Sequence, residues 1–321
     1  MRTLVHYLVC LMIAVDAAAA AQSAYPTKPI RLVVASSPGG PNELLARAII
    51  PGWTEALGRT VVIDARAGAA GVIGTDLAAK AAPDGYTLLL GFQGPLAIAP
   101  SLTGTPYDAL KDFAPVTLVA GAPFVLVVNP GVPAKTLIDL VALARARPGR
   151  LNFASGGVGI GSHLQMELLM QVAGISMVHV PYKGGGPALT ALAGSEVECA
   201  FAGVAAVLPH MKAERIRALA IGTEKRLAAV ANVPTFVESG YRINPTSWYG
   251  VLAPRATPPS IVALLHENLV RVVDAPGMRS KLVDMGFEVN VSTPDEFSTR
   301  LREESATWRK VIEVAGLKGK G

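Results

Sequence analysis

The chain has 321 residues, of which 51% are hydrophobic, 17% charged and 6% aromatic, and its formal net charge is +5. A chain of this length and apolar content can bury the cores of two ordinary domains, and its composition excludes an intrinsically disordered protein. Because the basic residues are dispersed and aromatic residues are few, the sequence predicts no binding of nucleic acid.

Residues 1–21 have the pattern of a cleaved export signal. Arg2 gives a basic start, residues 4–15 are apolar, and residues 17–21 are the small side chains that signal peptidase accepts. The apolar run is shorter than the roughly 20 residues that span a bilayer. Lipid attachment at Cys10 is disfavoured because Val9 is not the small residue required there. Cleavage removes Cys10 and leaves Cys199 as the single remaining cysteine, which excludes an internal disulfide.

Apolar runs of strand length alternate with helical patterns through most of the mature chain. In chain order they predict a strand at 30–35, a helix at 42–57, a strand at 61–63, a helix at 73–81, strands at 87–90 and 124–128, a helix after Lys135, a strand at 151–154, a helix from Ser162, a strand at 177–180, a helix at 187–193, a strand at 197–201, a helix at 204–212, strands at 216–221 and 248–252, and mainly helices after Pro258 with a strand-like run at 287–291. This alternation is typical of βαβ units around largely parallel sheets, so the predicted fold class is α/β.

The predicted elements form two comparable series that flank residues 120–123, and the last part of the chain is able to rejoin the first. We therefore expect two lobes, residues 24–123 plus 246–321 and residues 124–245, each a mainly parallel sheet with flanking helices. Open α/β sheets bind small molecules at the carboxyl ends of their strands. A ligand cleft between the lobes is the consequence.

Two glycine-rich turns each follow a strand-like run and open a helix. They are Ser37-Pro38-Gly39-Gly40 and the run from Ser155 to Ser162. A helix N-terminus offers unpaired N–H groups and a partial positive charge, both of which attract anions. Two such ends facing one cleft predict a site for a small carboxylate.

Motifs of catalysis are mostly absent from the sequence. It has no G-x-S-x-G elbow, no phosphate-binding G-x-x-x-x-G-K-[ST] loop and no H-E-x-x-H pair, and its histidines are not spaced as metal ligands. We therefore predict no enzyme activity, no cofactor and no metal. Ser162 and His163 are the one pair that offers a nucleophile and a base, but adjacent residues of a helix do not face each other. An exported serine hydrolase is the less favoured alternative.

Motifs spread over nearly all of the mature chain resemble one known family. They are found at residues 25–31, 38–40, 68–74, 82–89, 106–107, 111–116, 161–164, 178–184, 208–210, 219–220, 233–235 and 238–240. Their order and spacing resemble those of the solute-binding proteins of tripartite tricarboxylate transporters, the Bug or TctC family.

The resemblance implies a two-lobed periplasmic binding protein that closes over a small carboxylate and delivers it to the membrane permease subunits of a tripartite tricarboxylate transporter. A ligand-sensing receptor for a membrane sensor kinase is the second expectation. The family's two turns hold the carboxylate through backbone, hydroxyl and water contacts, which nominates Ser37, Pro38, Gly39, Gly40, Ser155, Gly156, Gly161, Ser162 and His163.

Other loops at the same sheet edges extend the predicted site. The first lobe adds Gly68, Ala69, Ala70, Gly71 and Gln93, and the second adds Tyr182, Lys183 and Gly184. Lys183 offers a cationic partner for a distal carboxylate, although a solvated surface lysine is the alternative. Tyr182 is suited to packing as much as to ligand contact.

Two departures from the family's pattern bear on the ligand. Glu43 stands where Asp is common, and Ala202 stands where the family commonly has Asp after a phenylalanine. If Ala202 lines the cleft, it removes a partner for an ammonium group and leaves a small apolar wall. We therefore expect a non-amino organic acid. The alternative is that Ala202 packs away from the cleft.

Overall fold

The computed structural model of the chain describes residues 25–36 and 41–319, so the predicted export signal and the turn from Ser37 to Gly40 lie outside the described residues. Its strands are β1 (Ile30–Val34), β2 (Val61–Ala65), β3 (Thr87–Phe92), β4 (Phe113–Val128), β5 (Asn152–Ser155), β6 (Val178–Pro181), β7 (Cys199–Gly203), β8 (Arg217–Ile221), β9 (Thr246–Pro254) and β10 (Glu288–Val289). Its helices are α2 (Pro41–Leu57), α3 (Val72–Ala79), α4 (Ala99–Leu102), α5 (Leu137–Ala146), α6 (Gly161–Ala173), α7 (Gly185–Ala193), α8 (Val204–Lys212), α9 (Pro259–Asp274), α10 (Pro276–Asp284) and α11 (Pro294–Val314), with short turns η1 (Ala69–Gly71), η2 (Gly94–Ile98) and η3 (Ala228–Val230).

The strands form one mixed sheet in the order β2-β1-β3-β9-β4-β7-β5-β6, with β8 and β10 also paired to β4. Strands β1, β2 and β3 are parallel to one another, and so are β5, β6 and β7. The predicted α/β class is confirmed. Both β4 and β9 run antiparallel to the strands that they join, so the sheet is less parallel than the sequence predicted.

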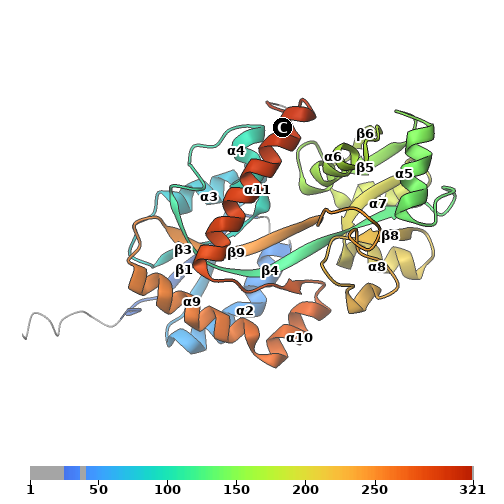
Figure 1. Ribbon diagram of the computed structural model, residues 1–321. Helices are drawn as coiled ribbons and strands as arrows, with labels where there is room; N and C mark the ends of the chain where they lie inside the picture. Colours follow the sequence, from blue (N-terminus) through green and yellow to red (C-terminus); the bar gives the residue numbers. More distant parts are fainter. Residues whose placement is uncertain (1–24, 37–40, 320–321) are drawn as a thin grey trace, which may run out of the picture.

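Strand β4 changes partners along its length. Residues 113–123 pair with β9, whereas residues 124–128 pair with β7 and β8. Figure 1 shows β4 and β9 extending from one part of the molecule into the other. We call the part built on β1, β2 and β3 lobe 1, and the part built on β5, β6, β7 and β8 lobe 2.

Both faces of the sheet are covered by helices. In lobe 1, α2 and α9 pack on one face around Trp53, and α3 and α11 pack on the other around Trp248. In lobe 2, α5 and α6 pack around Phe153, and α7 and α8 cover the opposite face. Burial on two faces explains why the strands read as continuous apolar runs.

The direction of the strands determines which loops meet. Strand β3 is antiparallel to β9 and therefore runs with β4, from lobe 1 toward lobe 2. Strand β5 is parallel to β7, which opposes β4, so it runs toward lobe 1. The carboxyl ends of both parallel sets, and the loops that follow them, therefore face the boundary between the lobes. Among residues 25–36 and 41–319, no helix combines the length and apolarity needed to span a membrane.

Candidate ligand-binding site

The loop after β2 has an unusual backbone. Residues 68–71 all have positive φ, including the non-glycine residues Ala69 at 45° and Ala70 at 52°. The N–H of Gly71 donates to the carbonyl of Gly68 at 2.9 Å. Each non-glycine residue in this region costs about 1–2 kcal/mol, and such strain is concentrated in loops that bind ligands.

Glycines let this strained loop lie against the end of β1. A Cβ on Gly71 would come within 2.9 Å of the carbonyl oxygen of Ala35 and of the Phe92 ring, and a Cβ on Gly74 within 2.9 Å of Cα of Ala35. The predicted residues Gly68, Ala69, Ala70 and Gly71 are thus held beside the strand that leads into the Ser37–Gly40 turn. The hydroxyl of Ser36 at this strand end is buried and has no hydrogen-bond partner among the residues that the structure describes. Ser36 was not among the predicted site residues.

In lobe 2, Ser155 organises the turn after β5. Its Oγ lies 2.8 Å from the carbonyl of Gly157, accepts the N–H of Gly157 at 3.1 Å, and lies 2.6 Å from Nε2 of His179. Ser162 Oγ accepts the N–H of Gly156 at 3.3 Å. Side-chain hydroxyls therefore fix both ends of this turn.

His163 holds the remainder of the turn and is 1% exposed. Its Nδ1 accepts the N–H of Gly159 at 2.9 Å, and its Nε2 lies 3.3 Å from Oε1 of Glu167. Both ring nitrogens are thus engaged with groups other than Ser162, and the hydroxyl of Ser162 is used by Gly156. This arrangement provides no base for Ser162 and argues against the serine hydrolase.

The N-terminus of α6 follows this turn directly. Its N-cap is Ile160, and no side-chain cap hydrogen bond is found there within residues 25–36 and 41–319. A Cβ on Gly161 would come within 2.9 Å of the Phe124 ring, and a Cβ on Gly159 would collide with Leu102 of α4. Glycines therefore let the helix end sit close to β4 and to lobe 1. An uncapped helix end in this position is suited to an anion.

The loop after β6 lies beside the same turn. The N–H of Tyr182 donates to the backbone carbonyl of Ser155 at 2.9 Å, and the N–H of Gly184 donates to the backbone carbonyl of Gly156 at 3.0 Å. The Tyr182 hydroxyl lies 3.4 Å from Glu196, and Lys183 is exposed. The structure therefore brings together the predicted residues of lobe 2 listed here: Ser155, Gly156, Gly161, Ser162, His163, Tyr182, Lys183 and Gly184.

Gln93 belongs to a neighbouring cluster. Its Nε2 donates to the carbonyl of Thr246 at 3.0 Å and to Glu304 at 2.8 Å, while Gln165 of α6 donates to the same carbonyl at 3.3 Å. These residues line a cavity of about 310 Å³ that α6 and α11 flank. No residue of the 155–162 turn contributes to its wall. Gln93 is therefore held within lobe 1, beside the carbonyl through which Gln165 of lobe 2 joins the two lobes.

The two departures from the family pattern have structural partners. Ala202 is 8% exposed and belongs to a buried cluster with Val125 and Val204, which favours the packing alternative for this residue. Glu43 is also buried, and its carboxylate pairs with Arg47 at 2.6 Å.

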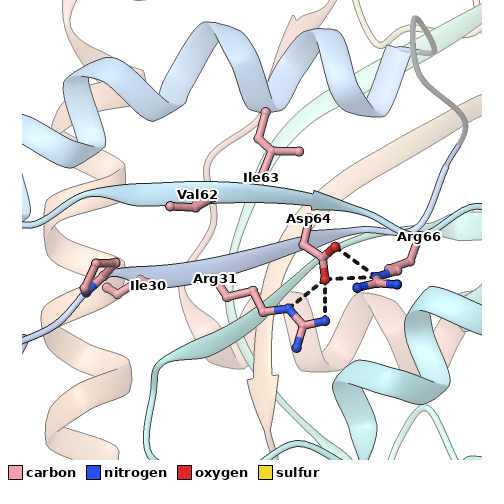
Figure 2. Close-up of a pocket in the computed structure, with 7 residues that line it drawn as sticks. Ile30, Arg31, Val62, Ile63, Asp64 and Arg66 are labelled. Atoms are coloured by element: carbon pink, nitrogen blue, oxygen red, sulfur yellow. Dashed lines mark hydrogen bonds and ion pairs between the residues drawn. The ribbon is translucent and has the colours of Figure 1, made fainter.

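A separate hollow of about 530 Å³ lies along β1 and β2. Figure 2 shows Asp64 between Arg31 and Arg66, on the opposite side of the strands from Ile63. Burial opposes ionisation of Asp64, but hydrogen bonds from Arg66 and Arg31 outweigh it and lower its pKa. Both guanidinium groups are therefore hydrogen-bonded to a carboxylate of the chain itself. Within the described ranges, no three His, Cys, Asp or Glu side chains are grouped to hold a metal ion.

The family model described as the tripartite tricarboxylate transporter family receptor matches residues 45–317. Protein BugT of Bordetella pertussis is 37% identical over 305 residues, covering 94% of each chain. The solved structure of R. palustris Rpa4515 with adipate is 34% identical, with a TM-score of 0.77, and covers 91% of this chain and 98% of that one. MatC of Rhodopseudomonas palustris with bound malate is 31% identical, with a TM-score of 0.73, covering 90% and 100%.

These similarities extend over most of the chain, and the matched proteins are receptors and binding proteins, which confirms that this chain is not an enzyme. The glycine-rich turns therefore lie on a solute-binding scaffold. With the α/β fold of the periplasmic binding proteins, the chain belongs to the tripartite tricarboxylate transporter receptor family, the TctC or Bug family.

Proposed function

We propose that the protein is a periplasmic receptor that captures a small, non-amino organic acid between its lobes and delivers it to the membrane permease subunits of a tripartite tricarboxylate transporter. The observation that carries this proposal is the uncapped N-terminus of α6, held toward lobe 1 by a turn that Ser155 and His163 fix. Helix N–H groups and hydroxyls in this arrangement bind a carboxylate without requiring a buried cation.

The lobe boundaries of the proposal are residues 24–123 plus 246–321 and residues 124–245. The change of partners within β4, between residues 123 and 124, supports this division. Thr246, at the start of β9, accepts hydrogen bonds from Gln93 of lobe 1 and Gln165 of lobe 2, as a point where the lobes pivot would.

The acid class rests on relatives and on local charge. Two relatives of similar length have structures with adipate or malate, and neither acid has an amino group. In this chain, the carboxylate of Glu43 is paired with Arg47, and that of Glu167 lies beside His163, so each has a partner other than an ammonium group of a ligand. Ala202 does not support the choice, because it packs in the core.

A thermal-shift panel tests the proposal. The mature chain, beginning at residue 22, is screened with adipate, malate, succinate, benzoate, glutamate and aspartate. A ligand that binds only the folded state raises the melting temperature. We therefore expect a shift with at least one of the acids that lack an amino group and no shift with glutamate or aspartate. Ser162→Ala should reduce that shift, whereas Ser298→Ala, at a partly exposed position on α11, should leave it unchanged.

Two outcomes would contradict the proposal. A shift with glutamate or aspartate alone would overturn the acid class, and an unchanged shift in Ser162→Ala would remove the helix end from the site. Delivery is tested separately by crosslinking the loaded receptor to membranes that contain the permease. Recovery of a sensor kinase in place of the permease would favour the sensing role.

A further inference from the structure

Two imidazole rings from different elements of lobe 2 are stacked on each other. The ring centroids of His163, on α6, and His179, on β6, are 3.7 Å apart, and the rings are 9° from parallel. Phe153 of β5 stacks on His179 with centroids 4.9 Å apart. The stack therefore joins one helix to two strands. His163 was among the predicted site residues, and His179 was not.

Each imidazole is bonded to a different part of the 155–162 turn. His163 Nδ1 accepts the N–H of Gly159 at 2.9 Å, and His179 Nε2 lies 2.6 Å from Oγ of Ser155. Ser155 is 1% exposed, so water cannot readily replace His179 as its partner. Through these two contacts the stacked pair supports both the start and the middle of the turn.

The hydrogen bonds around the two rings indicate which ring nitrogen of each histidine carries a hydrogen. A hydroxyl has one hydrogen and two acceptor lone pairs. Ser155 uses the hydrogen on the carbonyl of Gly157 and one lone pair on the N–H of Gly157, which leaves the second lone pair for an N–H from His179 Nε2. His163 accepts at Nδ1 and so carries its hydrogen on Nε2, facing Glu167. Each of these contacts is satisfied when both rings carry a hydrogen on Nε2.

We propose that His179 is a positioning residue for ligand binding: through Ser155 and through its stack on His163, it holds residues 155–159 in the conformation that receives the carboxylate. The inference rests on the proposed function, because it concerns the same turn. His179 itself makes no contact with the acid. Its effect on affinity is transmitted by Ser155 and the amides of Gly157 and Gly159.

Two substitutions separate hydrogen bonding from packing. His179→Phe keeps an aromatic ring in the stack but removes the donor to Ser155. His179→Gln loses the ring but retains an amide N–H at about the position of Nε2. A residue that served only in packing would tolerate Phe better than Gln, whereas a positioning residue should tolerate Gln better than Phe. His210→Phe on α8 is the matched control, because it changes a histidine outside the turn.

The first experiment measures amide hydrogen exchange by NMR on the ligand-free protein at pH 7. In His179→Phe we expect exchange at Gly157 to accelerate at least tenfold, because its acceptor Ser155 is released. The amide of Phe236, which bonds to Ile221 elsewhere in lobe 2, should keep its wild-type rate. His179→Gln and His210→Phe should leave Gly157 protected. Unchanged exchange at Gly157 in a folded His179→Phe protein would overturn the proposal.

The second experiment measures affinity by calorimetry with adipate and malate as probes. We expect His179→Phe to weaken binding of the better probe at least tenfold and His179→Gln to weaken it less than threefold. Equal affinity in His179→Phe and wild type would overturn the positioning role. If wild type binds neither these acids nor any other on the panel, the proposed function fails, and the Gly157 exchange rate still decides whether His179 holds the turn.

Ser155→Ala provides a second route if His179→Phe does not fold. It breaks the same contact from the other side and leaves the histidine stack in place. The variant should release Gly157 and weaken the better probe to a similar extent. Where His179→Phe does fold, combining it with Ser155→Ala should weaken binding little further, because both remove one linkage. Fully additive losses would contradict the proposal.

Discussion

Two turns face the boundary between the lobes, residues 68–71 in lobe 1 and residues 155–162 in lobe 2, and they keep their shapes in different ways. In lobe 1, residues 68–71 have consecutive positive φ angles and depend on glycines that fit against Ala35 and Phe92. In lobe 2, the turn from Ser155 depends on hydrogen bonds between its backbone and three side chains: Ser155 donates to a carbonyl, whereas Ser162 and His163 accept N–H groups. One turn is determined by steric room and the other by polar side chains.

This difference determines what each turn tolerates. A turn that depends on open space beside its glycines should be destabilised by any added Cβ, and its stability should not depend on pH. A turn that depends on hydroxyls and imidazoles accepts small changes of volume but responds to loss of a hydrogen bond or to protonation. The following predictions test this contrast.

The largest effect is expected at Gly71. Its φ is 96°, and an added Cβ would come within 2.9 Å of backbone and ring atoms. We expect Gly71→Ala to lower the free energy of unfolding by about 3 kcal/mol, because strain and collision add. Gly186→Ala, in α7 with open space around it and an ordinary φ, should change stability by less than about 1 kcal/mol. Equal effects in chemical denaturation would contradict the steric account.

Ser155→Ala should have the next largest effect. It removes the side-chain contacts to Gly157 and His179 and leaves buried groups without partners. We expect a loss of about 2 kcal/mol in the free energy of unfolding, measured by urea denaturation. Ser298→Ala, at a partly exposed position on α11, should stay within about 0.5 kcal/mol of wild type. A loss at Ser155 no larger than that at Ser298 would mean that the hydroxyl does not support the turn.

Acid should destabilise lobe 2 through His179. Burial, and then the neighbouring His163, lower the pKa of His179 from 6.5 to about 4. Between these values the unfolded chain binds the proton and the folded chain does not, so stability is full above pH 6.5 and falls as the pH decreases toward 4. The partly exposed ring should account for about 1–2 kcal/mol of this loss.

Carboxylates elsewhere also titrate in acid, so the measurement is the difference between wild type and His179→Phe. Melting temperatures from pH 7 to pH 4 should fall more steeply in wild type. Parallel curves for the two proteins would show that His179 does not titrate with folding.

The smallest effect on stability is expected at Lys183, which is exposed at the edge of the site. Lys183→Gln should change the free energy of unfolding by less than about 0.5 kcal/mol. If the ammonium group meets a second carboxylate, the substitution should weaken adipate about fivefold and leave the monocarboxylate hexanoate unchanged. Equal weakening of both acids in calorimetry would contradict a role at the distal carboxylate.

The sequence predicted the elements whose signals are local. The helix at 204–212 has the predicted bounds, and the helices after the glycine-rich runs begin within one residue of their predicted starts. Strand β4 was predicted only at 124–128, because Pro115, Gly121 and Pro123 interrupt its apolar pattern. The structure accommodates its first half with register shifts opposite β9.

The local structure of the candidate site was predictable where one loop supplies it and unpredictable where distant segments meet. Glycine spacing indicated Gly156, Gly161 and Ser162. By contrast, the contact of Gln93 with Glu304 spans 211 positions, and the stack of His163 on His179 joins a helix to a strand. No local pattern encodes such pairs, because they depend on how the elements are packed. The buried environment of Ala202 is likewise a property of the assembled core.

The most direct test of the account is a crystal structure of the mature protein with the acid that gives the largest thermal shift. We predict one carboxylate group at the N-terminus of α6, within hydrogen-bond distance of Ser162 or the backbone of Gly161, with the acid extending toward residues 68–71 of lobe 1. Density for the acid in the Arg31–Arg66 hollow, or in the cavity beside Gln93 and Glu304 with the α6 end unoccupied, would contradict the account.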